Sequence, residues 1–283
     1  MNTQTRQVIR TIEPQSVVEG AGVRLKRSIA GAALDYLDPF LLFDHFGSDR
    51  PEDYLPGFPM HPHRGIETVT YMLAGVVTHR DSLGNAGTIG AGDVQWMTAG
   101  RGIMHEEMPQ PVDGRMAGFQ LWVNLPARLK MTKPRYQEIL SAAVPEVRRD
   151  DGTVVRVIAG AVGDVRGPVT DIFAEPEYLD VSLPARARFE QPVTRGHNAF
   201  AYVFGGGGTF GDNTAALSSP KLVVLGDGDI VRAQAGEVGL RFLLVSGAPL
   251  GEPIARYGPF VMNTREEILQ ALADLRDGTF VQP

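Results

Sequence analysis

Two pairs of potential metal ligands, each with its members two residues apart, constrain how this chain can fold. His61 and His63 form the first pair, and His105 and Glu107 form the second. Side chains at positions i and i+2 of a β-strand project to the same face, so each pair places two donor groups on one side of a strand. If the two strands are neighbours, three imidazoles and one carboxylate meet at one point. The sequence therefore predicts a metal site between adjacent strands.

This set of donor groups favours a divalent transition metal. Imidazole nitrogen suits such ions, whereas calcium and magnesium prefer oxygen ligands. Four protein ligands on an octahedral ion leave two positions open to a substrate or to dioxygen. Structural metal sites are normally closed and tetrahedral, so the pattern indicates a metal that takes part in a reaction rather than one that only stabilises the fold. An isolated histidine is more often an ordinary polar residue, but that interpretation does not account for two same-face pairs.

Two other glutamates compete for the carboxylate position. Glu106 falls on the opposite face of its strand from the second ligand pair, so strand parity disfavours it. Glu67 lies four residues after His63 and shares its parity, so the spacing does not exclude it as a ligand. Glu67 is equally a candidate to orient an imidazole, or to pair with Arg64 or Arg80.

Around these residues the sequence resembles the pirin family of bicupins. The resemblance is carried by the motifs HPHRGIETVTYML (61–73), HRDSLGNAG (79–87), GDVQWMTAGRGIMHEEMP (92–109), LDPFLLFDHF (37–46) and GPFVMNT (258–264). It implies one metal, usually iron, in the first of two cupin barrels, with His61, His63, His105 and Glu107 as ligands. It therefore favours Glu107 over Glu67. The segment TAGRGIMH has the pirin form in place of the general cupin pattern P-x-G-x-x-H.

Composition and turn pattern predict an all-β protein. The 283 residues include 33 glycines and 20 prolines, which favours short strands and turns over long helices. The turn GDGD at 226–229 echoes GAGD at 90–93, and this echo indicates a duplicated barrel. Together with the resemblance, it predicts two tandem cupin (double-stranded β-helix, jelly-roll) barrels. We expect a metal-binding domain at 1–145 and a second domain, without metal ligands, at 146–283.

A single short helix is predicted at 264–277, near the C-terminus. Thr264 and Glu267 match a T-x-x-E capping box, and Gly278 follows at the position where helices commonly end. Its apolar stripe consists of Ile268, Leu269, Leu272 and Leu275. A helix this short is marginal alone, so we expect it to pack on a barrel. The alternative is that its apolar face binds a partner.

Several function classes are disfavoured by composition. The net charge of -6, with 27 Lys and Arg and no basic run, gives no electrostatic footprint for direct nucleic-acid binding. The chain has no cysteine, which excludes disulfides and thiolate ligands. No apolar run is long enough to span a bilayer, and the first residues lack the apolar core of a secretion signal. We therefore expect a soluble, cytoplasmic protein that acts as a monomer without contacting membranes or nucleic acid.

The pirin resemblance implies flavonol 2,4-dioxygenase (quercetinase) activity. By this hypothesis the 3-hydroxyl and carbonyl oxygens of a flavonol reach the open metal positions, Glu107 accepts the hydroxyl proton, and dioxygen cleaves the central ring with loss of carbon monoxide. The metal is expected to be Fe²⁺, with Mn, Co, Ni, Cu or Zn as alternatives. The alternative function is a non-catalytic iron protein whose redox state modulates a protein partner, such as a transcriptional co-regulator or a metabolic enzyme.

The enzyme hypothesis requires an apolar cavity beside the metal without a cluster of charged side chains. The candidate wall residues are Phe58, Met60, Ile66, Met72 and Trp122. Gln120, Trp122 and Asn124 share one face of a predicted strand, so they are expected to line either a pocket or a domain interface. The redox alternative needs charged surface residues next to the ligands, and Arg64 and Glu106 are the candidates.

We predict that one metal ion binds per chain, in the N-terminal barrel. Five of the six histidines precede residue 106, whereas His197 has no potential ligand two residues away. Among the five, His45 is a candidate fifth histidine at the metal, although a role in capping or core hydrogen bonding is favoured. His197→Ala should therefore leave the metal content unchanged in elemental analysis of protein purified without chelators. A content near two ions per chain that falls on this substitution would contradict the prediction.

Overall fold

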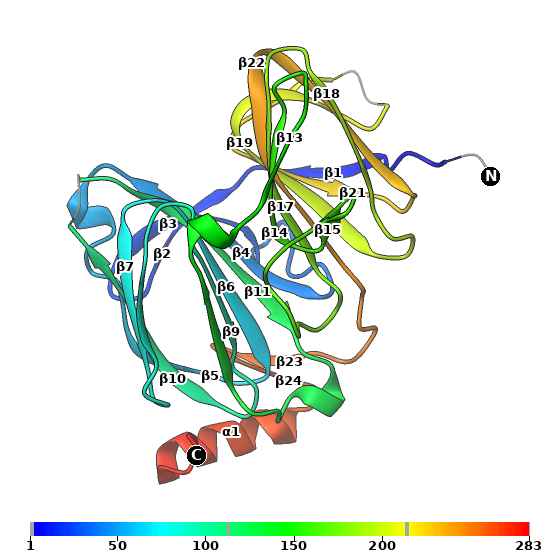
Figure 1. The fold of residues 1–283 in the computed structure, drawn as a ribbon. Helices are drawn as coiled ribbons and strands as arrows, with labels where there is room; N and C mark the ends of the chain where they lie inside the picture. Colours follow the sequence, from blue (N-terminus) through cyan, green and yellow to red (C-terminus); the bar gives the residue numbers. More distant parts are fainter. Residues whose placement is uncertain (1–2, 112–113, 213–214, 283) are drawn as a thin grey trace. The chain divides into compact units, whose positions relative to one another are not determined.

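The computed structural model describes residues 3–111, 114–212 and 215–282 and is built mainly of antiparallel β-strands (Figure 1). The all-β prediction is confirmed, and the α-helix of the described residues lies near the C-terminus as expected. Contacts between residues divide the chain into two units. The N-unit comprises Gln15–Ser141 and Leu250–Pro283, and the C-unit comprises Met1–Pro14 and Ala142–Pro249.

These units differ from the predicted domains, 1–145 and 146–283, at both ends of the chain. Strand β1 (Val8–Ile12) pairs with β21 (Lys221–Leu225), which places the first residues in the C-unit. The backbone N–H of Val261 donates to the carbonyl of Arg64, which places the last segment in the N-unit. The first residues of the chain thus belong to the C-unit, and the last segment belongs to the N-unit. Pairing between residues far apart in the sequence causes this arrangement, and composition does not predict it.

Two antiparallel sheets face each other in the N-unit. The larger has the order β12 (Arg135–Ile139), β9 (Val94–Thr98), β6 (Ile66–Ala74), β11 (Met116–Asn124), β4 (Phe40–Ser48), β3 (Val23–Ile29) and β2 (Gln15–Glu19). The smaller has the order β5 (Phe58–His63), β10 (Ile103–Gln110), β7 (Val76–Asp81) and β8 (Ala86–Ile89). Their inner faces touch, because Thr70 on β6 contacts Glu107 on β10 and Gln95 on β9 contacts His79 on β7.

Part of the contact between these two sheets is polar, beside an apolar cluster that also joins them. Thr70, Gln95, His79, His105 and Glu107 are all buried there. Burying polar groups costs free energy unless each finds a partner, so an interior of this kind does not arise from packing requirements alone. The inner faces of the N-unit are therefore organised around a site.

The C-unit has a single curled sheet with an apolar interior. Its order is β1, β21, β19 (Asn198–Phe210), β22 (Ile230–Gly247), β17 (Glu177–Leu183), β14 (Val154–Ala159) and β13 (Glu146–Arg148), with β18 (Arg188–Pro192) on β22 and β20 (Leu217–Ser218) on β19. A short hairpin joins β15 (Ala161–Val162) to β16 (Val165–Arg166). The sheet curls because β22 pairs with β18 through its first half and with β17 through its second. Val157, Leu179 and Phe242 are among the fully buried side chains of its core.

The four consecutive glycines at 205–208 belong to β19. The register of β19 against β22 shifts twice around this run, as it does at β-bulges. Gly206 has a φ of 64°, and a Cβ at this position would lie 2.1 Å from the carbonyl oxygen of Gly239. Only glycine combines this backbone conformation with so close an approach. Backbone geometry thus accounts for the run.

The C-terminal helix α1 (Arg265–Asp277) begins and ends as predicted. Thr264 accepts a hydrogen bond from the N–H of Glu267, the Glu267 side chain accepts one from the N–H of Thr264, and Gly278 has a left-handed conformation. The predicted apolar stripe is only partly correct: Ile268 is buried and Leu272 packs against the core, but Leu269 and Leu275 are 55% and 37% exposed. The small side chain of Ala271 takes the inward position instead.

Two buried cations attach this C-terminal segment to the chain just after β5. Arg64 donates to Asp274 of α1 at 2.6 Å, and its guanidinium lies 4.4 Å from the centre of the Phe280 ring. Lys130 donates to the carbonyls of Gly65 and Val261, both at 2.8 Å. These carbonyls accept hydrogen bonds from the buried amine, and burial lowers the pKa of Lys130 to about 7. The short strands β23 (Ala255–Tyr257) and β24 (Phe260–Met262) complete this segment.

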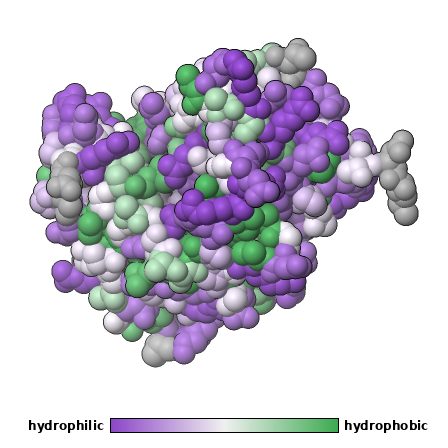
Figure 2. Space-filling model, turned by 45° about the horizontal axis from the view of Figure 1, so that its top comes forward, coloured by the Kyte–Doolittle hydropathy of each residue, from purple (hydrophilic) through white to green (hydrophobic). Residues whose placement is uncertain are grey.

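The remaining regular elements are the 3₁₀ turns Pro51–Asp53, Ala127–Leu129 and Ser141–Ala143. No helix among the described residues is both long enough and apolar enough to cross a membrane. On the face shown in Figure 2, hydrophilic residues predominate and apolar ones occur in small groups between them.

We predict that Gly206→Ala destabilises the C-unit more than Gly196→Ala does. Both glycines have positive φ, and an alanine there costs about 1 kcal/mol or more from the backbone alone. Only at position 206 would the new Cβ meet backbone, since nothing lies within 4 Å of a Cβ at position 196. The clash should add roughly 1–3 kcal/mol. Urea unfolding of both variants measures the difference, and equal loss of stability would show that close approach is not the reason for glycine.

Candidate metal centre and its cavity

The structure brings together the three histidines that the sequence singles out. Strands β5 and β10 are antiparallel neighbours, and His61 lies directly opposite His105 in their register. One donor nitrogen from each of His61, His63 and His105 lies within 4.8 Å of the other two. The same-face pairing expected from the i, i+2 spacing is therefore present on β5, and the strand partner supplies the third imidazole.

The His61 and His63 rings are arranged as two ligands of one ion would be. The Nδ1–H of His61 donates to the carbonyl of Pro59 at 2.9 Å, which leaves the lone pair on Nε2. This Nε2 lies 3.1 Å from Nε2 of His63. Two nitrogens that bind an ion at about 2.1 Å and at right angles are themselves about 3.0 Å apart. A backbone carbonyl that fixes the tautomer is also what metal-binding histidines normally have.

His105 provides a second indication of a metal site. Its side chain is fully buried, and within the described part of the chain neither ring nitrogen has a hydrogen-bond partner. Burial lowers the pKa of His105 well below its ordinary value, and the neighbouring imidazole of His63 lowers it further. Burial also lowers the pKa of His63, with His61 as the second cause. Both rings are therefore neutral at neutral pH, which is the form that binds metals.

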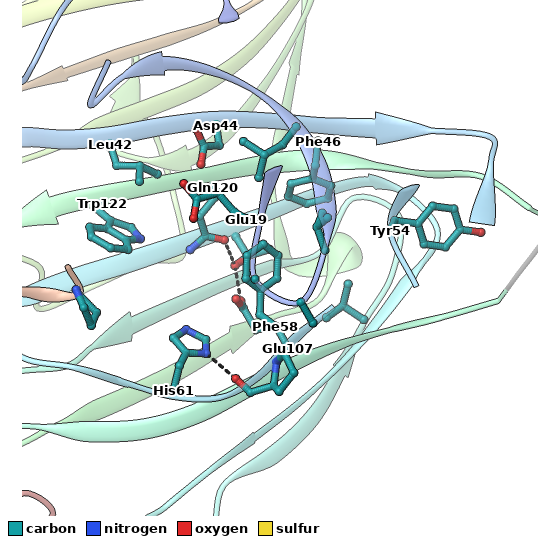
Figure 3. Close-up of a pocket in the computed structure, with 18 of the residues that line it drawn as sticks. Glu19, Leu42, Asp44, Phe46, Tyr54, Phe58, His61, Glu107, Gln120 and Trp122 are labelled. Atoms are coloured by element: carbon teal, nitrogen blue, oxygen red, sulfur yellow. Dashed lines mark hydrogen bonds between the residues drawn. The ribbon is translucent and has the colours of Figure 1, made fainter. Parts of the chain in front are cut away.

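Glu107 faces the same cavity but lies outside the group of three. It lines the cavity with His61 and His63, and its Oε1 accepts a hydrogen bond from the Thr70 hydroxyl at 2.9 Å (Figure 3). The same hydroxyl lies 2.8 Å from Oε1 of Gln120. A buried carboxylate held beside three imidazoles is suited to complete a metal site or to accept a proton there. Its assignment as the fourth ligand stays a prediction.

Glu67 is placed differently from the sequence expectation. Strand β5 ends at His63, Gly65 turns the chain with a φ of 80°, and β6 begins at Ile66 in the other sheet. The shared parity of Glu67 and His63 therefore has no structural meaning. Glu67 is fully buried and accepts a hydrogen bond from the Thr98 hydroxyl at 2.7 Å.

The two arginines proposed as partners of Glu67 have other partners. Arg64 pairs with Asp274, and Arg80 lies 3.5 Å from Glu106. His45 does not join the group of three histidines. Its ring lies 4.8 Å from that of Phe119, and burial lowers its pKa to about 4.

His79 is a site residue that the sequence reasoning missed. It is fully buried on β7 directly opposite Glu107, and its ring centre lies 5.3 Å from that of His105. Nδ1 of His79 lies 2.9 Å from the Gln95 amide nitrogen, and Nε2 lies 3.7 Å from Asp81. His79 and Asp81 form a third i, i+2 pair of the same kind, and that spacing was the available signal.

A cavity of about 550 Å³ opens beside the histidines. Its apolar lining consists of Ala21, Val23, Leu25, Leu42, Phe46, Tyr54, Phe58, Pro59, Val77, Pro109, Met116, Trp122 and Pro259 (Figure 3). Of the predicted walls, Phe58 and Trp122 are correct. Ile66 and Met72 instead belong to apolar core clusters, and Met60 is 48% exposed and is not part of the lining.

The strand face that carries Gln120 and Trp122 was expected to line a pocket or an interface, and both residues line this cavity. The third member, Asn124, instead accepts a hydrogen bond from Lys130.

The expectation of a cavity without clustered charges is wrong. Glu19, Arg27, Asp44 and Arg256 all line it. Arg27 donates to both oxygens of Asp44 at 2.9 and 2.7 Å and to Glu19 at 2.7 Å. These residues come from three different regions of the sequence, so no local motif predicts that they lie together.

The comparisons with known proteins agree with this architecture. The family model "Pirin" matches residues 22–123, and the model "Pirin C-terminal cupin domain" matches residues 178–281. The chain belongs to the pirin family. Both units are accordingly cupin-type domains.

Pirin relatives match along almost the whole chain. A "Pirin-like protein" of Caulobacter vibrioides is 48% identical over 97% of this chain and 99% of its own length. A Pseudomonas aeruginosa protein described as "Putative quercetin 2,3-dioxygenase" is 46% identical over 98% of both chains. A crystal structure of quercetin 2,3-dioxygenase from Acinetobacter baumannii is 36% identical and superposes with a TM-score of 0.89 over 98% of both chains.

We predict that Glu107→Gln weakens metal binding by about tenfold, whereas Glu67→Gln leaves it almost unchanged. An amide is a weaker ligand than a carboxylate, but three imidazoles would remain to hold the ion. The two substitutions are isosteric and both positions are buried, so each controls for the other. Competition with a chromophoric chelator measures the affinity. The reverse ranking would assign the carboxylate position to Glu67.

Proposed function

We propose that this pirin is a metal-dependent dioxygenase that cleaves flavonols such as quercetin. The observation that carries the proposal is a cavity of about 550 Å³ into which His61, His63 and Glu107 all project. Cavities of roughly 300–1,000 Å³ with apolar walls and a few placed polar groups are typical of small-molecule sites. The descriptions of the Pseudomonas and Acinetobacter relatives support the same substrate class.

The three histidines are suited to hold one divalent ion, and we propose Fe²⁺ as that ion. When bound, it would act as a Lewis acid that lowers the pKa of a coordinated flavonol hydroxyl. Glu107 would accept the proton of this hydroxyl. The Thr70 hydroxyl holds Oε1 of Glu107, so Oε2 is the candidate acceptor.

The remaining lining would orient the substrate and exclude water. Trp122 stands beside His63 with ring centres 5.0 Å apart and planes at 84°, and Phe58 lies 6.3 Å from the His61 ring. Aromatic side chains in this position favour a flat aromatic ligand that lies between them. Gln120 can donate an amide hydrogen to a ligand oxygen, because its side chain lines the same cavity.

The non-catalytic alternative has less support from the residues around the site. It requires charges beside the metal that a protein partner can reach. Arg64 is 1% exposed and is bound to Asp274, so it does not present its charge to a partner. Glu106 is partly exposed and remains a candidate for that role.

We predict that iron-loaded protein consumes oxygen with a flavonol and releases carbon monoxide, and that His61→Ala lowers this rate by roughly 100-fold or more. His197→Ala is the matched control, since it removes an imidazole from the C-unit. An oxygen electrode measures the consumption of dioxygen, and carbon monoxide detection measures the released product, over a panel of flavonols. If no flavonol supports uptake while ferrous and ferric forms differ in affinity for a protein partner, the non-catalytic function should replace this one.

A further inference from the structure

Arg256 lines the cavity from the C-terminal segment, on strand β23. Its guanidinium carbon lies 5.1 Å from the centre of the Trp122 ring, and its Nη1 donates to the carbonyl of Leu41 at 3.1 Å. Trp122 in turn contacts the ring of His63. A single indole therefore separates a guanidinium group from a member of the histidine group. Arg256 is exposed, which places it at the open side of the cavity.

The two arginines of the cavity differ in their ion pairing. Arg27 is matched by Asp44 and Glu19 in direct contacts. For Arg256, no carboxylate of the described residues lies within ion-pair distance. Burial and, after it, the Arg27 cation lower the pKa of Arg256, and the carboxylates of Asp35, Asp44 and Glu19 offset only part of this, so an anion placed beside it would be favoured. The planar guanidinium also presents two donors in a fork that matches a carboxylate.

We propose that Arg256 is a specificity-determining residue that binds an acidic oxygen, a carboxylate or a phenolate, at the outer end of a flat aromatic ligand whose inner end reaches the histidines. The inference rests on the proposed function for the orientation of the ligand. It follows from the order of groups along one wall of the cavity, which is imidazole, indole and guanidinium. A ligand stacked along Trp122 would meet a metal-binding group at one end and a cation at the other.

Calorimetric binding to zinc-loaded protein tests the proposal without turnover. The probes are 3-hydroxyflavone and two derivatives that carry one carboxylate, each on a different outer ring. We expect at least one carboxylated probe to bind wild-type protein more tightly than the parent compound. Arg256→Gln should reduce this preference about two- to fivefold, the range for an exposed ion pair, and Arg256→Lys should retain part of it. Arg265→Gln, which removes an exposed charge at the start of α1, should leave it unchanged.

The outcomes separate this inference from the function on which it rests. If Arg256→Gln weakens the carboxylated and parent probes equally, or if neither carboxylated probe is preferred by wild-type protein, the inference is wrong. An Arg256-dependent preference in the zinc form without oxygen uptake in the iron form would uphold the inference and overturn the dioxygenase function. Turnover of flavonols in which the wild-type protein has the same KM for charged and neutral substrates, and Arg256→Gln changes neither KM, would overturn the inference and uphold the dioxygenase function.

Discussion

The pairing of β5 with β10 is the interaction on which the site depends. It sets His61 opposite His105, and the alternation of side chains along β5 adds His63 on the same face. A shift of one residue in this register would turn the imidazoles of one strand away from those of the other. The register has support at the end of β5, where Arg64 donates to Asp274 of the C-terminal segment and Lys130 bridges the carbonyls of Gly65 and Val261. Local strand geometry thus creates the site, and contacts from distant segments hold it.

A comparison of the two units shows that the site requires polar side chains to be buried, which costs folding free energy. Both are cupin-type domains, but the C-unit core is made of aliphatic and aromatic side chains, whereas the inner faces of the N-unit bury histidines, a glutamate and a glutamine. Side-chain hydrogen bonds offset part of the penalty, as between Thr70 and Glu107 or between Gln95 and His79. His105 is buried without such a partner among the described residues, and a bound metal would satisfy it. A duplicated fold needs this polar interior only once, which agrees with the isolated position of His197.

The sequence predicted those parts of the site that depend on local spacing. The histidine pair on β5 and the helix caps at Thr264 and Gly278 are of this kind, because neighbouring residues determine them. The prediction that Glu67 shares a strand face with His63 was wrong, because the chain turns at Gly65 and Glu67 lies on a strand of the other sheet. The charged side of the cavity was not predicted, because Arg27 and Arg256 are far apart in the sequence and line one cavity only in the folded N-unit. The assignment of the first residues to the C-unit and of the last segment to the N-unit was not predicted for the same reason.

The C-terminal segment contributes both to the stability of the site and to the wall of the cavity. Asp274 and Val261 bind the chain beside His63 through Arg64 and Lys130, and Arg256 from the same segment lines the cavity. The segment therefore fixes the end of the strand that carries two histidines and also supplies a wall of the pocket. A substitution at Arg256 removes its contacts with Leu41 and Trp122 at the open side of the cavity, whereas the contacts of Asp274 and Val261 lie elsewhere in the segment. If Arg256 binds the outer end of a ligand as proposed, this contact can change while the anchor, and with it the histidine geometry, stays in place.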